Sequence, residues 1–233
     1  MNLDLNDDIQ RAIYFGMFER DELEFLRGCV GQGDVCIDAG ANVGFYTCHL
    51  ASWVGSLGHV HAFEPEPKNA ERLAVNVRLN GFSPRVTIHP EALSFEKGHA
   101  RFNRAASGRS GWGSFHRYEG HVETIEVETE TVDGLMEEQG LDQIALLKVD
   151  VEGADFDVYR GASKTLEKRA ARYVMAEWNG VWFPRQGRSF RDFTSHFAQY
   201  GYRPLLPERS VIDRYAGDEV EALGKIVNVV FGR

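Results

Sequence analysis

The stretch Cys36-Ile37-Asp38-Ala39-Gly40-Ala41-Asn42-Val43-Gly44-Phe45-Tyr46 decides the fold. Its apolar beginning is typical of a buried strand, and the strand stops at an acid, Asp38. Two glycines, Gly40 and Gly44, flank a short turn before residues 45–53 begin a helix. Glycines let backbone N–H groups approach a ligand closely, and a helix N-terminus offers unpaired donors. The stretch is therefore either an ordinary connection between a strand and a helix or a binding turn.

A second predicted strand favours the binding turn over the ordinary connection. The segment Val60-His61-Ala62-Phe63-Glu64-Pro65 ends with a carboxylate, Glu64, about 20 residues beyond the glycine turn, where nucleotide-binding α/β units hold ribose hydroxyls. A dinucleotide fingerprint would require a glycine in place of Asn42 and an apolar residue in place of Asp38, so NAD is disfavoured. Two acids around a glycine turn suit a ligand with an amino-acid part and an adenosine, which is S-adenosylmethionine.

Composition bounds the class of protein. The 233 residues suit one large domain with an ample core, and 43% hydrophobic and 26% charged residues are ordinary for a soluble globular protein. The net charge of -9 argues against nonspecific binding to nucleic acid or to anionic membranes. Three cysteines do not suggest a disulfide framework. We expect a cytoplasmic chain without a signal peptide or membrane span, and the sequence is compatible with a homodimer.

The remaining elements alternate as in a doubly wound sheet. Residues 1–30 have apolar side chains at helical spacing, which predicts two short helices whose apolar stripe is typical of core packing. Strands are predicted at 85–89, 144–149 and 173–178, with helices between them. Two last strands, at 202–206 and 226–231, would close the sheet at one edge.

Residues 98–130 interrupt this alternation. They predict a β-excursion that carries a loop rich in small residues, which is either a lid over a site or simply a flexible loop. His116 in this loop is either a catalytic candidate or an exposed histidine. Before the excursion, backbone groups of Ala92 and Leu93 could hold an adenine edge, and Glu91 is either part of that site or a solvated carboxylate.

Two acids, Asp150 and Glu152, follow the predicted strand at 144–149. Ligands of a doubly wound sheet bind outside the carboxyl ends of the strands, so these acids would face a transferable group. The alternative is that they stabilise the N-terminus of the next helix without any chemical role. A metal site would need further ligands that the sequence does not supply, so no metal is predicted.

These segments together resemble the family of FkbM-type S-adenosylmethionine-dependent methyltransferases. The motifs that carry the resemblance follow one another in order: Asp38-Ala39-Gly40-Ala41-Asn42-Val43-Gly44, Phe63-Glu64-Pro65-Glu66-Pro67, Glu91-Ala92-Leu93-Ser94, Leu147-Lys148-Val149-Asp150-Val151-Glu152-Gly153 with Gly161-Ala162, and Met175-Ala176-Glu177-Trp178. The resemblance implies an α/β, Rossmann-like class I methyltransferase. Its sheet would be seven-stranded and mostly parallel, with an antiparallel last strand, helices on both faces and a β-excursion.

The resemblance also implies methyl transfer to a hydroxyl oxygen of a sugar or a polyketide-like natural product. We therefore predict a single domain, 1–233, that uses S-adenosylmethionine and takes a small-molecule or glycan acceptor. Within it, residues 1–30 would form the N-terminal helices and residues 98–130 the lid. The alternatives are a non-catalytic protein that binds the same cofactor and a nucleotide-dependent oxidoreductase.

Each predicted site residue has an expected role. Asp38 and Gly40 would hold the methionine part, Glu64 the ribose, and Ala92 with Leu93 the adenine. The candidates for a base that takes the hydroxyl proton are Asp150, Glu152 and His116, with the two acids ranked first. The predicted cofactor-binding residues are Asp38, Gly40, Asn42, Gly44, Glu64, Pro65, Glu91, Ala92, Leu93 and Asp150.

Overall fold

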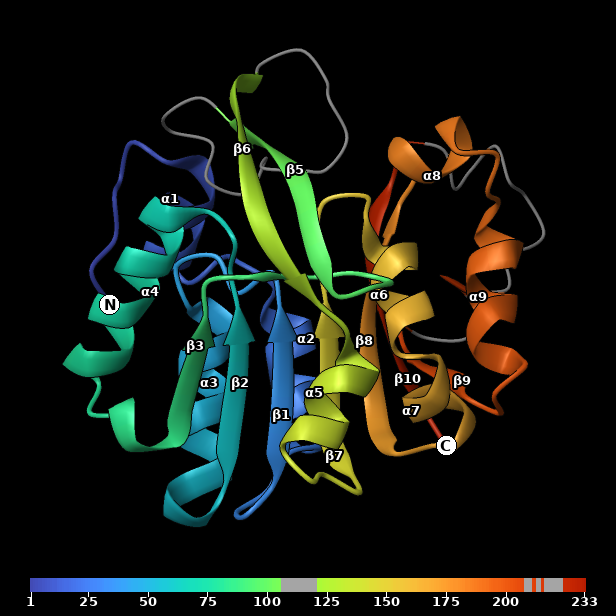
Figure 1. The fold of residues 1–233 in the computed structure, drawn as a ribbon, viewed down its shortest axis with the longest axis horizontal. Helices are drawn as coiled ribbons and strands as arrows, with labels where there is room; N and C mark the ends of the chain where they lie inside the picture. Colours follow the sequence, from blue (N-terminus) through green and yellow to red (C-terminus); the bar gives the residue numbers. More distant parts are fainter. Residues whose placement is uncertain (106–120, 208–210, 213–214, 216–223) are drawn as a thin grey trace.

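A seven-stranded sheet forms the centre of the computed structural model, which describes residues 1–105, 121–207, 211–212, 215 and 224–233 (Figure 1). The strands lie in the order β3 (Val86–His89), β2 (His59–Phe63), β1 (Val35–Ala39), β7 (Ile144–Val149), β8 (Ala171–Asn179), β10 (Ile226–Gly232) and β9 (Arg203–Leu206). The first five are parallel, and β10 runs antiparallel to β8 and β9. This order confirms the predicted mostly parallel sheet with an antiparallel last strand.

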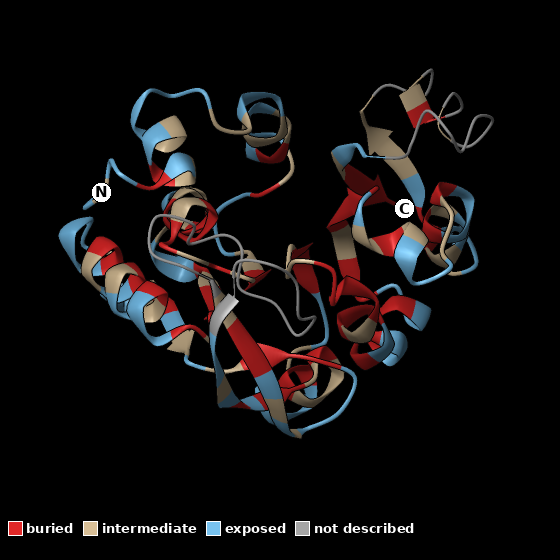
Figure 2. Ribbon diagram, turned by 90° about the horizontal axis from the view of Figure 1, so that it is seen from above, coloured by how far each residue is buried: buried red, intermediate tan, exposed pale blue. Residues whose placement is uncertain are grey.

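Helices cover both faces of the sheet, which is why its central strands are continuous apolar runs. One face packs against α2 (Arg20–Arg27), α3 (Phe45–Val54) and α4 (Pro67–Leu79). The other packs against α5 (Val132–Glu138), α6 (Asp155–Gly161), α7 (Ser163–Glu167) and α9 (Phe190–Ala198). Figure 2 shows the buried residues gathered on the strands and on the inward sides of these helices. Further short helices are α1 (Asp8–Tyr14), η1 (Gly55–Leu57), η2 (Ser83–Arg85) and α8 (Trp182–Arg185).

A second sheet rises above the carboxyl ends of the main strands (Figure 1). It contains β4 (Ala92–Leu93), β6 (His121–Glu130) and β5 (Gly98–Ala105), with β5 and β6 antiparallel. Arg104 of β5 forms an ion pair of 2.7 Å with Glu66, whose side chain caps α4. The predicted strand excursion is therefore present and tied to α4. Its role as a lid stays a prediction, and His116 lies outside the described residues.

The two predicted N-terminal helices are present; the apolar side chains of α2 pack into the core as expected, but those of α1 do not. Ile9 and Ile13 of α1 (Asp8–Tyr14), together with Phe18, line a pocket at the carboxyl ends of the strands. Tyr14 and Phe15 are 61% and 62% exposed. The difference arises because α1 borders the carboxyl ends of the strands and does not lie on a face of the sheet. Within the described residues, no helix combines the length and apolar character needed to cross a bilayer.

Three histidines form a row at the edge made by β2 and β3. The rings of His59 and His61 are 4.9 Å apart, and His61 Nδ1 lies 3.2 Å from His89 Nε2. His89 also stacks on Phe63, with ring centroids 4.2 Å apart. Burial, followed by the neighbouring charges of His59 and His89, lowers the pKa of His61 from 6.5 to about 4. His61 is therefore neutral in the folded protein over most of the acidic range.

We expect His61 to make the free energy of unfolding fall as the pH drops from 6.5 to about 4. The unfolded chain takes up this proton near pH 6.5 and the folded chain only near pH 4, so the contribution is complete above pH 6.5 and is lost below it. The loss should reach about 3 kcal/mol. Urea unfolding of the wild type and of His61→Gln across this range measures it. The difference between the two proteins isolates His61, because the other titrating groups are present in both. Glu64, for example, has a raised pKa and an opposite effect on stability, and its contribution cancels. A difference that does not vary with pH would contradict this expectation.

Candidate active site

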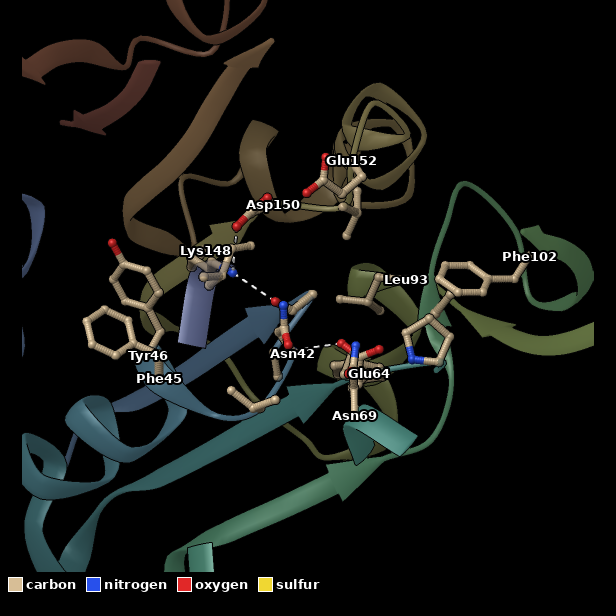
Figure 3. Close-up of a pocket in the computed structure, with 18 of the residues that line it drawn as sticks. Asn42, Phe45, Tyr46, Glu64, Asn69, Leu93, Phe102, Lys148, Asp150 and Glu152 are labelled. Atoms are coloured by element: carbon tan, nitrogen blue, oxygen red, sulfur yellow. Dashed lines mark hydrogen bonds and ion pairs between the residues drawn. The ribbon is translucent and has the colours of Figure 1, made fainter. Parts of the chain in front are cut away.

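A pocket opens at the carboxyl ends of β1, β2 and β7 (Figure 3). The turn 40–43 after β1 lines it, as do Glu64 after β2 and residues 150–152 after β7. Leu93 of β4 and Phe102 of β5 add apolar surface on the side away from Tyr46 (Figure 3). The pocket therefore combines a few polar groups with apolar walls, as small-molecule sites do.

The glycine turn brings the ends of β1 and β7 unusually close together. Gly40 has φ +75°, and a Cβ at this position would lie 1.9 Å from the carbonyl oxygen of Asp150. Only glycine fits there. Gly44 has φ +92° and precedes α3, where a Cβ would lie 2.6 Å from Leu73 Cδ1. Gly40 thus shapes the pocket itself, whereas Gly44 allows α3 to pack against α4.

Glu64 is held by backbone donors at the end of β2. Its Oε2 accepts a hydrogen bond of 2.7 Å from the N–H of Asn42, and its Oε1 accepts one of 2.9 Å from the N–H of Glu66. Burial raises the pKa of Glu64 from 4.5 to about 7, although these N–H groups act to lower it. The side chain of Asn69 forms a third hydrogen bond with Glu64, so this carboxylate is firmly fixed and has room for a further donor.

Lys148 of β7 lies between two carboxylates, the buried Asp38 and the pocket residue Asp150. Its Nζ lies 3.3 Å from Asp38 Oδ1 and 3.4 Å from Asp150 Oδ2, and it donates to the carbonyl oxygen of Gly40 at 3.0 Å. Burial alone would lower the pKa of Lys148, but the adjacent carboxylates outweigh it and raise the pKa. Asp38 is fully buried and accepts a hydrogen bond of 2.6 Å from Thr47 Oγ1. Asp38 therefore supports the pocket through Lys148 and does not line it.

Asp150 and Glu152 do not act as helix caps. The α6 N-cap residue, Ala154, makes no side-chain cap, and Asp155 instead accepts hydrogen bonds from the N–H groups of Gly153 and Val151 at 3.0 and 3.4 Å. Glu152 has φ +54°, a left-handed conformation that is costly for a residue with a Cβ. Burial, followed by the charges of Asp150 and Asp155, raises the pKa of Glu152 well above 4.5. Glu152 is thus a pocket carboxylate that readily takes up a proton.

The structure brings most of the predicted site residues to this one pocket. Those that line it are Gly40, Asn42, Glu64, Pro65, Ala92, Leu93, Asp150 and Glu152. Asp38 and Gly44 lie behind the lining, the half-buried Glu91 is not part of it, and His116 lies outside the described residues.

Sequence reasoning missed the apolar lining from α1 and from Phe102 of β5. Nothing in the spacing of these residues distinguishes them from ordinary core or strand positions. In the described part of the chain, no group of three or more histidine, cysteine or acidic side chains is arranged to hold a metal ion.

The sheet, with β10 antiparallel and a pocket beside the glycine turn, has the Rossmann-like arrangement of the methyltransferase fold. The model of the Methyltransferase FkbM domain matches residues 38–204, and the chain belongs to this family. A methyltransferase FkbM from Methylobacillus flagellatus KT is similar in structure, with a TM-score of 0.55 and 14% identity over 99% of this chain and 56% of that one. An rRNA methylase from Streptococcus thermophilus has a TM-score of 0.51 and 9% identity over 93% and 98% of the two chains. At these identities the likeness concerns the fold alone.

Three curated relatives are similar in sequence. The 2-O-methyltransferase NoeI of Sinorhizobium fredii is 30% identical over 50% of this chain and 52% of the relative. The methyltransferase sdnD of Sordaria araneosa is 26% identical over 61% and 65%. The hexuronic acid methyltransferase AglP of Haloferax volcanii is 27% identical over 68% and 62%. The matches thus span about half to two thirds of each relative's length.

Proposed function

We propose that this protein transfers a methyl group from S-adenosylmethionine to a hydroxyl group of a small-molecule or glycan acceptor. The observation that carries the proposal is Glu64, fixed by the N–H of Asn42 beside the glycine turn. The names of NoeI, a 2-O-methyltransferase, and AglP, a hexuronic acid methyltransferase, support oxygen as the acceptor atom and a sugar as the acceptor. The net charge of -9 disfavours nucleic acid as the acceptor.

The pocket fits this cofactor on two counts. Gly40, where a Cβ would lie 1.9 Å from the carbonyl oxygen of Asp150, lets the glycine turn and the end of β7 meet in one pocket. Glu64 is a fixed acceptor with room for a ribose hydroxyl, and Leu93, Pro65 and Phe102 offer apolar contacts for the adenine. Asp150 lies at the other end, where the methionine part would bind (Figure 3).

The bound cofactor supplies a sulfonium-activated methyl group, so the main task of the chain is alignment. The pocket walls would hold the acceptor oxygen in line with the methyl carbon and exclude water. We assign the removal of the hydroxyl proton to Glu152, because its raised pKa makes it a stronger base than an ordinary carboxylate. Asp150 is the weaker candidate, since its carboxylate is paired with Lys148. His116 stays an alternative.

Thermal unfolding with added ligands tests the cofactor assignment. S-Adenosylmethionine or S-adenosylhomocysteine at about 100 times Kd should stabilise the wild type by about 2.7 kcal/mol and raise Tm by about 5 to 10 °C. NAD should have no effect. Glu64→Ala should lose most of the shift, because the ribose hydroxyls lose their acceptor, whereas Glu71→Ala at an exposed position of α4 should keep it.

A shift with NAD alone would overturn the proposal, and full binding by Glu64→Ala would remove the ribose assignment. Incubation with radiolabelled S-adenosylmethionine and a panel of hydroxylated sugars and polyketides tests turnover. Cofactor binding without transfer to any acceptor would favour the non-catalytic alternative.

A further inference from the structure

Glu19 lies just before α2, outside the residues that match the family model. It has φ +43°, and its side chain does not cap the helix that it precedes. The Oη of Tyr46 in α3 instead donates a hydrogen bond to Glu19 Oε2. This bond turns the carboxylate of Glu19 away from its own helix and toward the residues at the start of α3.

The carboxylate of Glu19 lies beside one end of the pocket. Its neighbours in the chain and in space, Phe18 and Tyr46, both line the pocket. Lys148 Nζ lies 5.3 Å from the centre of the Tyr46 ring and 3.4 Å from Asp150 Oδ2. Figure 3 places Tyr46 at the end of the pocket opposite Leu93 and Phe102. Glu19 and Asp150 therefore border the end farthest from the apolar surface assigned to the adenine.

The charges at this end do not balance among the described residues. Lys148 is shared between Asp38 and Asp150, and its charge also acts on Glu19, so one cation serves three carboxylates. Burial, followed by the charge of Asp150, raises the pKa of Glu19 from 4.5 to about 7. A cationic donor from a ligand at this end would relieve the charge excess.

We propose that Glu19, together with Asp150, binds the ammonium group at the amino-acid end of the cofactor. The assignment rests on the proposed function. It makes the N-terminal segment part of the binding site, because Ile9, Ile13 and Phe18 supply apolar lining and Glu19 supplies charge. Lys148 keeps Asp150 in place, and Tyr46 does the same for Glu19.

Two ligands distinguish this role from a purely structural one. S-Adenosylhomocysteine carries the ammonium group, whereas 5′-methylthioadenosine shares the nucleoside and lacks the amino-acid end. Glu19→Gln keeps an acceptor for Tyr46 Oη but removes the charge. In calorimetric titration we expect this variant to bind S-adenosylhomocysteine roughly 10- to 100-fold more weakly than the wild type does. Its affinity for 5′-methylthioadenosine should be unchanged. Glu24→Gln, at an exposed position of α2, is the matched control and should bind both ligands as the wild type does.

Each other outcome overturns the assignment. Equal weakening of both ligands by Glu19→Gln would show that the residue only supports the pocket, and unchanged binding of both would show that it takes no part. Tyr46→Phe separates the hydrogen bond from the charge, because it removes the hydrogen bond and leaves Glu19 ionisable. It should lower the affinity for S-adenosylhomocysteine less than Glu19→Gln does. If the wild type binds neither ligand, the proposed function itself fails, and this assignment fails with it.

Discussion

Replacing Lys148 by methionine is expected to destabilise the protein by about 4 kcal/mol, because breaking a buried ion pair from one side leaves an uncompensated charge. Lys148 is 2% exposed, and its partner Asp38 is fully buried. Methionine has a similar length but supplies neither the charge 3.3 Å from Asp38 nor the hydrogen bond to the carbonyl oxygen of Gly40. Urea unfolding at neutral pH measures the loss.

A second substitution identifies the cause of this loss. Asp38→Asn in the Lys148→Met background removes the negative charge that Lys148→Met leaves buried and unpaired. The double variant should therefore be more stable than the sum of the two single effects predicts. Lys164→Met, at an exposed position of α7, is the control and should change stability by less than about 0.5 kcal/mol. A loss below about 1 kcal/mol for Lys148→Met would show that the pair with Asp38 contributes little.

The fold could be predicted because its signals are local. Asp38 is the last residue but one of β1, Gly40 and Gly44 mark the turn, and Glu64 directly follows β2, so the boundaries of each unit can be located from its own residues. Parallel strands joined by helices then place these ends at one edge of the sheet. This is why the sequence also located most of the polar lining of the pocket.

The rest of the site depends on packing between distant segments. Glu19 reads in the sequence as an acid at a helix start, and only the contact with Tyr46 turns it toward the pocket. The apolar side chains of α1 have helical spacing whether they face a core or a ligand. The sequence also left open whether Asp150 and Glu152 cap α6, and it is Asp155 that binds the backbone there.

Glu152→Gln is expected to lower kcat about 100- to 1000-fold, since an amide cannot take the proton of the acceptor hydroxyl. Glutamine keeps the size of the side chain, so S-adenosylhomocysteine should bind the variant as it binds the wild type. Steady-state kinetics with the acceptor found in the radiolabel screen measure the loss. Glu126→Gln, at an exposed position of β6, serves as the control and should retain wild-type kcat.

The pH dependence of kcat tests more directly whether Glu152 is the base. A base acts in its ionised form, and burial, followed by the charges of Asp150 and Asp155, raises the pKa of Glu152 well above 4.5. Wild-type kcat should therefore fall as the pH drops through that raised pKa, and the residual activity of Glu152→Gln should lack this acidic limb. Asp150→Asn should keep the limb, shifted to lower pH, because it removes a negative charge that raises the pKa of Glu152. An unchanged limb in Glu152→Gln would assign the proton transfer to Asp150 or His116 instead.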